Sequence, residues 1–430
     1  MTSPIITHVH GRQILDSRGR PTVEAEITLS DGTVARASVP SGASTGKAES
    51  VELRDGGAAW GGKAVGRAVG NINDRVASAV AGLSAFDQGA LDARLVEVDG
   101  TDNFGGIGAN AALAVSLATL RAGALAQRLP LYRWIATLIG VKPTMPLPMV
   151  NILSGGLHAG RGMDVQDFLA MPVGAANYSE ALEWICRIRT TATELCAAQG
   201  LPVLLADEGG LSPGFERSEE ALDMMVAAIE AAGLTPGKDV GIVLDIASSS
   251  LVDANGGYRF ERLGETFDAA QMIDMQAAWI ERYPIISIED GLGEDDWAAW
   301  PALTERLGHI QLVGDDLFAT QPARVQRGID SGGGNAALIK VNQNGTVSGT
   351  FDAIRTARGG GFATVISARS GETEDDFLAD LAVGVAGGQI KVGSVRNSER
   401  LAKYNQLLRI EEAGLPWAGA SGVAPLGVKA

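Results

Sequence analysis

Six strand-like segments in the second half of the chain each end in a charged side chain. Each segment is a short run of apolar, often β-branched residues, as in Ile285–Glu289, which is typical of a buried strand in a parallel sheet. In a β/α barrel the carboxyl ends of the strands meet at one mouth, where active sites lie. The sequence therefore predicts that six groups converge there. They are Asp245, Glu289, Asp315, Lys340, Arg369 and Lys391.

The three acids at these strand ends suggest a metal site. Carboxylates brought together repel one another and raise each other's pKa unless a cation holds them. With only four histidines and two cysteines in the chain, an oxygen-liganded cation such as Mg²⁺ is favoured. The alternative is that each acid merely caps the helix that follows. We expect the adjacent Asp290 and Asp316 to support the site or cap loops.

The cations at the later strand ends suggest an acid–base function and anion binding. Near divalent cations the pKa of a lysine such as Lys340 should fall, which suits a general base. A base beside carboxylate-held metals can remove a proton next to a carboxylate, and the metals stabilise the resulting dianion. Arg369 and the adjoining Ser370 offer a guanidinium fork and a hydroxyl, which suit a phosphate.

Three loops carry further candidate residues. Glu208 lies in the glycine-flanked segment 206–210, either as a loop acid or as an acid or base opposite Lys340. His158 lies among the glycines of segment 155–160, where a ligand could approach closely. The small-residue segment Ser41–Gly46 is either a flexible connector or a lid over the mouth.

The remaining elements predict an α/β protein with two domains. Strands at Val23–Leu29 and Thr33–Val39, followed by three helices, predict an N-terminal α+β cap over residues 1–138. A segment with three prolines, Val141–Pro148, marks the boundary. Residues 139–430 then alternate strands and helices, with an irregular first half, as expected for a TIM-type β/α barrel that carries the catalytic site.

The composition narrows the class of protein and its partners. The chain has 430 residues, of which 46% are hydrophobic and 20% charged, as in soluble enzymes. A net charge of −16 argues against nucleic acid or an anionic membrane as partner. We find no signal-peptide pattern, and the apolar stretch Ala109–Leu120 is too short to span a bilayer. We therefore expect a cytoplasmic protein.

The two cysteines are not expected to form a disulfide. Cys186 and Cys196 are ten residues apart in one helical segment. At a rise of ~1.5 Å per residue they would lie roughly 15 Å apart, too far for a bond.

Several motifs resemble those of the enolase family, and the resemblance runs nearly end to end. It rests on Asp16–Thr22 (DSRGRPT), Ser41–Gly46 (SGASTG), Gly108–Ala118, Asp207–Gly210, Ser287–Leu292, Val313–Phe318 (VGDDLF), Ser370–Asp375 (SGETED), Gln389–Ser394 and Ala402–Glu412.

The resemblance implies a role for each candidate residue. Asp245, Glu289 and Asp315 would hold one Mg²⁺, and Ser44 would join a second that binds with the substrate. Lys340 would take the C2 proton of 2-phosphoglycerate, and Glu208 would assist departure of the C3 hydroxyl, with Asp167 and His158 as further catalytic residues. Lys391 would neutralise the carboxylate, Arg369 and Ser370 would hold the phosphate, and Gln166 would line the pocket. Enolases are usually dimers or larger, through the cap domain.

Four positions depart from the family motifs. The family has asparagine where this chain has Arg20 and Ser154, glutamate where it has Asp167, and histidine where it has Ala368. The changes at Asp167 and Ala368 fall on the leaving-group and phosphate side of the expected site. The side that removes the proton is unchanged.

Three functions follow from these features. The first is the glycolytic dehydration of 2-phospho-D-glycerate to phosphoenolpyruvate. The second is a paralogue of the carboxyphosphonoenolpyruvate synthase type, from phosphonate antibiotic biosynthesis, that acts on a substrate with a modified phosphorus group; the space at Ala368 and the added cation Arg20 favour it. The third is a non-catalytic protein with this fold, but then a cluster of buried charge would serve no purpose.

Overall fold

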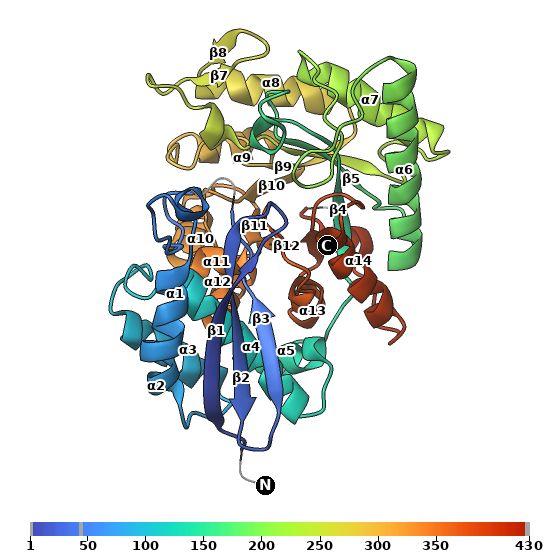
Figure 1. The fold of residues 1–430 in the computed structure, drawn as a ribbon. Helices are drawn as coiled ribbons and strands as arrows, with labels where there is room; N and C mark the ends of the chain where they lie inside the picture. The colour runs from blue at the N-terminus through green and yellow to red at the C-terminus, as the bar shows by residue number, and fades with distance from the viewer. Residues whose placement is uncertain (1–2, 43–45, 426–430) are drawn as a thin grey trace.

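The computed structural model describes residues 3–42 and 46–425 and shows a small cap beside a closed barrel (Figure 1). The cap contains a three-stranded antiparallel sheet in the order β1-β2-β3. A five-residue π-helical segment, Ile72–Val76, joins its first two helices into one rod. The bounds of the cap elements are β1 Ile6–Leu15, β2 Pro21–Leu29, β3 Val34–Ser38, α1 Gly66–Asn71, α2 Ala77–Val80, α3 Gln88–Asp99, α4 Ala109–Ala126 and α5 Leu131–Ile139.

Helix α4 forms the core of the cap. It packs on β2 and β3, and nearly all of its residues are buried. The predicted apolar stretch continues six residues beyond Leu120. The expectation that it is too short to cross a membrane was therefore wrong, because the whole helix is long and apolar enough to do so. Because 83% of its apolar window is buried inside the protein, its hydrophobicity is explained by the core.

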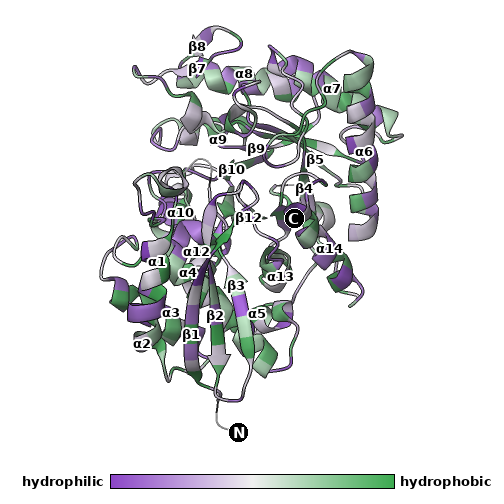
Figure 2. Cartoon of the chain, viewed as in Figure 1, coloured by the Kyte–Doolittle hydropathy of each residue, from purple (hydrophilic) through white to green (hydrophobic). Residues whose placement is uncertain are grey.

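The second part is a barrel of eight strands, in the order β10-β11-β12-β13-β4-β5-β6-β9, which closes through the pairing of β9 with β10. Helices lie around it, and Figure 2 shows the outer helix α6 banded in purple and green, as expected when one face packs on the barrel. The strands are β4 Leu147–Ser154, β5 Asp167–Met171, β6 Gly241–Asp245, β9 Ile285–Glu289, β10 Gln311–Gly314, β11 Ala336–Ile339, β12 Ala363–Ser367 and β13 Gln389–Lys391, with a separate hairpin of β7 Tyr258–Phe260 and β8 Glu265–Phe267. The helices are α6 Tyr178–Ala198, α7 Ser218–Ala231, α8 Ala269–Arg282, α9 Trp300–Leu307, α10 Pro322–Ser331, α11 Val341–Asn344, α12 Val347–Gly359, α13 Phe377–Gly384 and α14 Ser398–Glu411.

One strand of the barrel runs in the opposite direction to its neighbours. Strand β5 is antiparallel to both β4 and β6, whereas the other barrel pairs are parallel. The start of β5 therefore lies at the same mouth as the ends of the parallel strands, and Asp167 pairs with Asp245 at the end of β6. This reversal brings Gln166 and Asp167 to the mouth although they precede or begin a strand.

The predicted α/β fold, a TIM-type barrel with an N-terminal α+β cap, is confirmed, and the structure adds elements that the sequence analysis did not identify. These are β1, α5, α7, α10, the short helix α11 and the β7–β8 hairpin. Helix α6 begins at Tyr178, and its N-cap is Asn177, whose side chain accepts from Glu180 N. Cys186 and Cys196 are both free, as expected. The domain boundary between residues 138 and 139 stays a prediction.

Candidate active site

The three predicted carboxylates lie at adjoining strand ends at the barrel mouth. Asp245 ends β6, Glu289 ends β9, and these two residues pair across the strands. Asp315 follows β10, which is the next strand around the barrel. All three are buried, with exposed fractions of 3%, 1% and 8%. The predicted convergence is therefore present in the structure.

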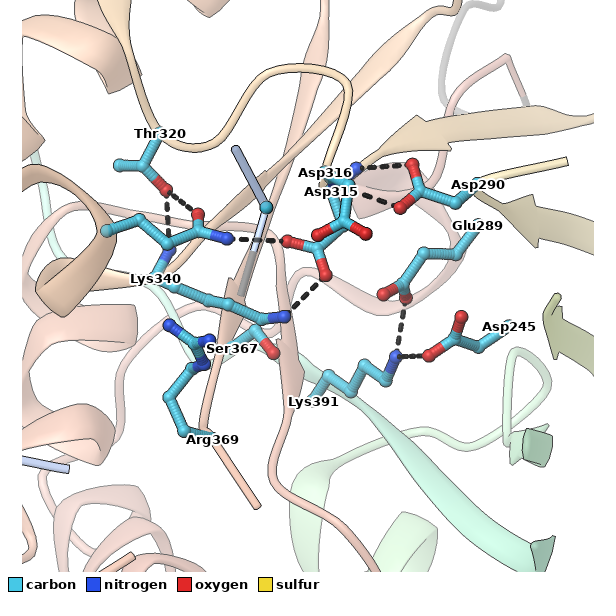
Figure 3. A network of polar contacts seen from close by, with 12 residues as sticks. Asp245, Glu289, Asp290, Asp315, Asp316, Thr320, Lys340, Ser367, Arg369 and Lys391 are labelled. Atoms are coloured by element: carbon cyan, nitrogen blue, oxygen red, sulfur yellow. Dashed lines mark hydrogen bonds and ion pairs between the residues drawn. The ribbon is translucent and has the colours of Figure 1, made fainter. Parts of the chain in front are cut away.

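Lys391 neutralises two of these acids. Its Nζ lies 2.8 Å from Asp245 Oδ2 and 2.6 Å from Glu289 Oε2 (Figure 3). Burial and the neighbouring Asp245 raise the pKa of Glu289 well above its usual range, although Lys391 opposes this. Burial lowers the pKa of Lys391, but the two carboxylates raise it well above its ordinary value. The three side chains form a buried unit in which one ammonium serves two carboxylates.

Lys340 forms the second ammonium–carboxylate contact, with Asp315 Oδ2 (Figure 3). The other oxygen, Asp315 Oδ1, accepts from Gln343 Nε2 at 2.9 Å. Burial lowers the pKa of Lys340, but Asp315 raises it above the ordinary lysine value. Burial raises the pKa of Asp315, but Lys340 lowers it below its usual range. Lys340 is therefore charged as long as Asp315 keeps its negative charge beside it.

Asp290 positions the loop that carries Asp315. Its two carboxylate oxygens accept from the backbone N–H groups of Asp315 and Asp316, each at 2.9 Å. Its own φ is +44°, a left-handed conformation that few side chains adopt. This is the loop-capping function expected for Asp290. Burial and then Asp315 raise the pKa of Asp316 to about 7.

The donor set at the mouth fits a hard cation, although the predicted three ligands are not the tightest group. Within the described residues, two groups have potential ligand atoms that lie within 4.8 Å of one another, Asp290–Asp315–Asp316 and His158–Asp167–Glu208. In the predicted set, the carboxylates contact ammonium groups: Lys391 contacts Asp245 and Glu289, and Lys340 contacts Asp315. Gln166 donates to Asp245 Oδ2 at 3.2 Å, and its buried Oε1 has no hydrogen-bond partner among the described residues. Buried carboxylates and an amide oxygen are the ligands that Mg²⁺ prefers.

Arg369 and Ser370 lie where β12 gives way to a loop, between the ends of β11 and β13. Arg369 makes a two-point ion pair with Glu49, NH1 to Oε2 at 2.9 Å and NH2 to Oε1 at 3.2 Å, and NH1 also donates to Asn342. Arg18 NH1 lies 3.4 Å from Ser370 Oγ. Cationic donors from the cap and the barrel thus meet beside the mouth, which suits an anion.

A third group joins the 155–160 loop, the start of β5 and the 206–210 loop. His158 Nδ1 lies 2.9 Å from Asp167 Oδ2, and His158 Nε2 lies 3.7 Å from Glu208 Oε1. Burial alone would lower the pKa of His158, but Asp167 and Glu208 raise it to about 9. Burial raises the pKa of Glu208, but His158 lowers it below its usual value. Near neutral pH the contact of His158 with Glu208 is therefore between an imidazolium and a carboxylate.

Most predicted site residues line one cavity. Asp167 and Glu289 are not among its lining residues: Asp167 is fully buried behind His158, so it supports the wall without facing the cavity. Ser44 lies outside the described residues, as does half of the segment from Ser41 to Gly46, so the predicted function of this segment as a lid stays a prediction. The lining residues are His158, Gln166, Glu208, Asp245, Ala247, Asp290, Asp315, Asp316, Lys340, Ser367, Ala368, Arg369, Ser370 and Lys391.

Sequence reasoning missed three residues that hold the predicted groups in place. These are Glu49 on Arg369, Gln343 on Asp315, and Asn151, which donates to Glu208 Oε2 at 3.2 Å. Glu49 follows the small-residue loop and Gln343 lies three residues after Lys340. Only Asn151 gave a signal, as a polar residue within the apolar run 147–153, whereas Glu49 and Gln343 stand among other polar residues.

Comparison with family models accounts for most of the chain. The model described as the enolase N-terminal domain matches residues 6–135. The model described as the enolase C-terminal TIM barrel domain matches residues 142–422. Both matches fall on the parts of the molecule seen as cap and barrel.

Proposed function

The chain belongs to the enolase family, and on that premise we propose that it is a Mg²⁺-dependent lyase that dehydrates 2-phospho-D-glycerate to phosphoenolpyruvate. The observation that carries the proposal is the set of three buried carboxylates and two lysines at adjoining strand ends. Lysine and carboxylate side chains in this arrangement can remove a proton next to a carboxylate.

Asp245, Glu289 and Asp315 would hold the first Mg²⁺, and Ser44 would join a second. Bound there, Mg²⁺ would stabilise the negative charge that develops on the substrate carboxylate. If Asp315 held a cation, it would raise the pKa of Lys340 less, and burial would lower that pKa. Lys340 Nζ can then accept the C2 proton.

The C3 hydroxyl leaves on the side formed by Glu208 and His158. The pKa of Glu208 is lowered, so Glu208 is ionised at neutral pH and needs a proton before it can assist departure of hydroxide as water. His158, whose pKa is about 9 and whose Nε2 lies 3.7 Å from Glu208, is a nearby proton source. Asp167 contacts His158 and acts through it.

The anionic ends of the substrate have separate partners. Lys391 would neutralise the carboxylate, and Gln166 would line the same side. Arg369 and Ser370 would bind the phosphate, with Arg369 already held in place by Glu49 and Asn342. We also propose a homo-oligomer formed through the cap and a cytoplasmic location, since family members usually have the first and a net charge of −16 suits a soluble enzyme.

The test is an assay of purified protein with 2-phosphoglycerate and Mg²⁺, followed by the ultraviolet absorbance of phosphoenolpyruvate. We expect turnover in the usual enzyme range of ~1–10³ s⁻¹, abolished by a chelator and restored by added Mg²⁺. A folded protein that binds Mg²⁺ but does not turn over would overturn the substrate assignment.

A second candidate is a paralogue that accepts a substrate with a modified phosphorus group, of the carboxyphosphonoenolpyruvate synthase type. Ala368 lines the cavity where the family has histidine, so space is left beside Arg369. A separate hollow includes Glu49 and Asn342, which hold Arg369, and is lined by four cations, Arg18, Arg20, Arg54 and Lys63. Arg20 is exposed, and its side chain has no ion-pair partner within the described residues.

These features would accommodate an additional negative group. Comparing 2-phosphoglycerate with an analogue that carries a carboxyl group on phosphorus tests this. Under the second candidate, Arg20→Asn lowers kcat/KM for the analogue and leaves that for 2-phosphoglycerate unchanged. Equal effects on both substrates would exclude it.

A further inference from the structure

A line of polar contacts runs from the end of β4 to the mouth. Ser154 Oγ donates to Asp167 Oδ1 at 2.5 Å, Asp167 Oδ2 contacts His158 Nδ1 at 2.9 Å, and His158 Nε2 faces Glu208. Ser154 and Asp167 are fully buried, whereas His158 and Glu208 line the cavity. Ser154 and Asp167 can therefore act on a substrate only through His158.

The backbone fixes Ser154 opposite Asp167. The two residues are cross-strand partners where β4 ends and the reversed strand β5 begins. Ser154 N also donates to Leu211 O at 2.7 Å, which anchors the strand end to the loop that carries Glu208.

The 206–210 loop leaves room for the Ser154 hydroxyl at one position. A Cβ added to Gly210 would lie 2.2 Å from Ser154 Oγ, closer than any real contact. Glycine at 210 is therefore required for the hydroxyl to point at Asp167. The loop that supplies Glu208 thus also determines where Ser154 points.

Two of the four departures from the family motifs meet in this single contact. Where the family has asparagine and glutamate, this chain has Ser154 and Asp167, and both replacements are shorter. A carboxylate one methylene shorter reaches less far, so its position depends more on what holds its second oxygen. Ser154 supplies that contact.

We propose that Ser154 is a positioning residue that acts through Asp167 to fix the ring of His158 against Glu208, so that Ser154, Asp167 and His158 work as one unit. The unit orients the proton source for departure of the leaving group and does not contribute to substrate binding. The kinetic consequence rests on the proposed function, but the orientation of His158 does not.

The kinetic test is a double-mutant cycle of Ser154→Ala and Asp167→Asn. Loss of a hydrogen bond to a charged group should lower kcat by about tenfold, with KM unchanged because Ser154 does not reach the cavity. In the Asp167→Asn background, Ser154→Ala should have less than a twofold further effect. Equal losses in the two backgrounds would show that Ser154 acts independently of Asp167 and would overturn the proposal.

The matched control is Ser394→Ala. Ser394 is also a fully buried serine near Glu208, since its N–H donates to Glu208 O, but its hydroxyl has no partner among the described residues. Its removal should leave kcat within twofold. If Ser154→Ala does not fold, Ser154→Cys keeps similar volume with a weaker donor and should show the same loss.

A spectroscopic measurement separates this proposal from the choice of substrate. The chain has four histidines, so the ring N–H signals can be assigned by nitrogen-15 NMR of the full protein. We expect the Nδ1–H signal of His158 to be protected from solvent, to lose that protection in Ser154→Ala and to keep it in Ser394→Ala. An unchanged signal in Ser154→Ala would overturn the proposal whether or not the protein turns over 2-phosphoglycerate.

Discussion

The two sides of the barrel mouth neutralise their buried charge in different ways. On the side of β6, β9, β10, β11 and β13, acids and lysines contact each other directly, as in Lys391 with Asp245 and Glu289. On the side of β5 and the 155–160 loop, His158 is the one cation that faces Asp167 and Glu208 among the described residues, and the neutral side chains of Ser154 and Asn151 hold these two acids in addition. The first side matches the family motifs at each charged residue, and the departures at Ser154 and Asp167 fall on the second side. The departure at Ala368 falls at the end of β12, between β11 and β13.

This difference shows where a site of this kind can change. Removal of one partner in a direct ion pair leaves an uncompensated buried charge, which is strongly unfavourable. Replacement of a supporting hydrogen-bond partner changes an orientation and leaves the charge balance intact. We therefore expect divergence to accumulate on the supported side, and the following predictions test the contrast.

The largest effect should come from Lys340→Ala. Because Lys340 would remove the C2 proton, its loss should lower kcat by at least about 10²–10⁴-fold, the usual contribution of a general base. Turnover of the variant is compared with that of Lys238→Ala, a change at an exposed lysine. Activity retained in Lys340→Ala would contradict the assignment of Lys340 as the general base. It would also contradict the functional contrast between the two sides of the mouth.

Lys391→Met should destabilise the protein in the absence of Mg²⁺. Two buried carboxylates lose their ammonium, and the free energy of unfolding should fall by about 3–5 kcal/mol. Added Mg²⁺ should restore more stability to this variant than to the unmodified protein, because the cation takes over the charge of Lys391. Denaturant unfolding with Mg²⁺ or with chelator measures both values.

Lys403→Met is the matched control for this variant. Lys403 is also buried and pairs with Glu372 at 3.0 Å, and Glu372 supports the backbone of Arg369 and not the carboxylates of Asp245 and Glu289. It should lose stability without a larger response to Mg²⁺. An equal Mg²⁺ response in both variants would show that Asp245 and Glu289 are not the metal ligands.

Asp380 shows what a buried acid does when no cation contacts it among the residues that the structure describes. It accepts from Tyr132 N and Gln406 Nε2, each at 3.0 Å, and burial raises its pKa to about 6. The folded state therefore holds a proton that the unfolded state releases from about pH 4, and stability falls as the pH rises from about 4 to about 6.

Asp380→Asn should remove that slope. The variant should gain at most about 3 kcal/mol over the unmodified protein above pH 6 and little below pH 4. Unfolding measured across pH 4–7 checks this, and an unchanged pH slope in the variant would show that Asp380 does not titrate in this range.

The smallest effect should come from Ala368→His, which restores the family residue on the phosphate wall. If 2-phosphoglycerate is the substrate, an added donor beside its phosphate should raise kcat/KM by roughly tenfold. If the substrate carries a larger phosphorus group, the same change should fill the space it needs and lower kcat/KM for that substrate. Assays of both substrates decide between the two candidates.

Much of the mouth could be predicted because strand ends are encoded locally. A run of apolar residues followed by a charge places Asp245, Glu289, Lys340 and Lys391 without knowledge of their partners. The pairing of Lys391 with two acids could not be read from the sequence, since it depends on how the barrel closes between β13 and β4.

Contacts between the cap and the barrel could not be predicted from the sequence either. Glu49 and Arg369 are 320 residues apart, and only the packing of the cap on the mouth brings them together. The reversal of β5 was also not predicted, because the amino-acid sequence of a short buried strand does not indicate whether it runs parallel or antiparallel to its neighbours. Gln166 and Asp167 were therefore identified by resemblance, and their geometry came from the structure.

The reversed strand has an evolutionary consequence. Successive residues in a strand point to opposite faces, and at the start of β5 this separates Gln166, which lines the cavity, from Asp167, which is fully buried. A mutation at 167 can retune the acidity and orientation of the wall without altering the surface that a substrate meets. Mutations at such a position allow descendants of the protein to acquire activity toward new leaving groups while the substrate-binding residues stay the same.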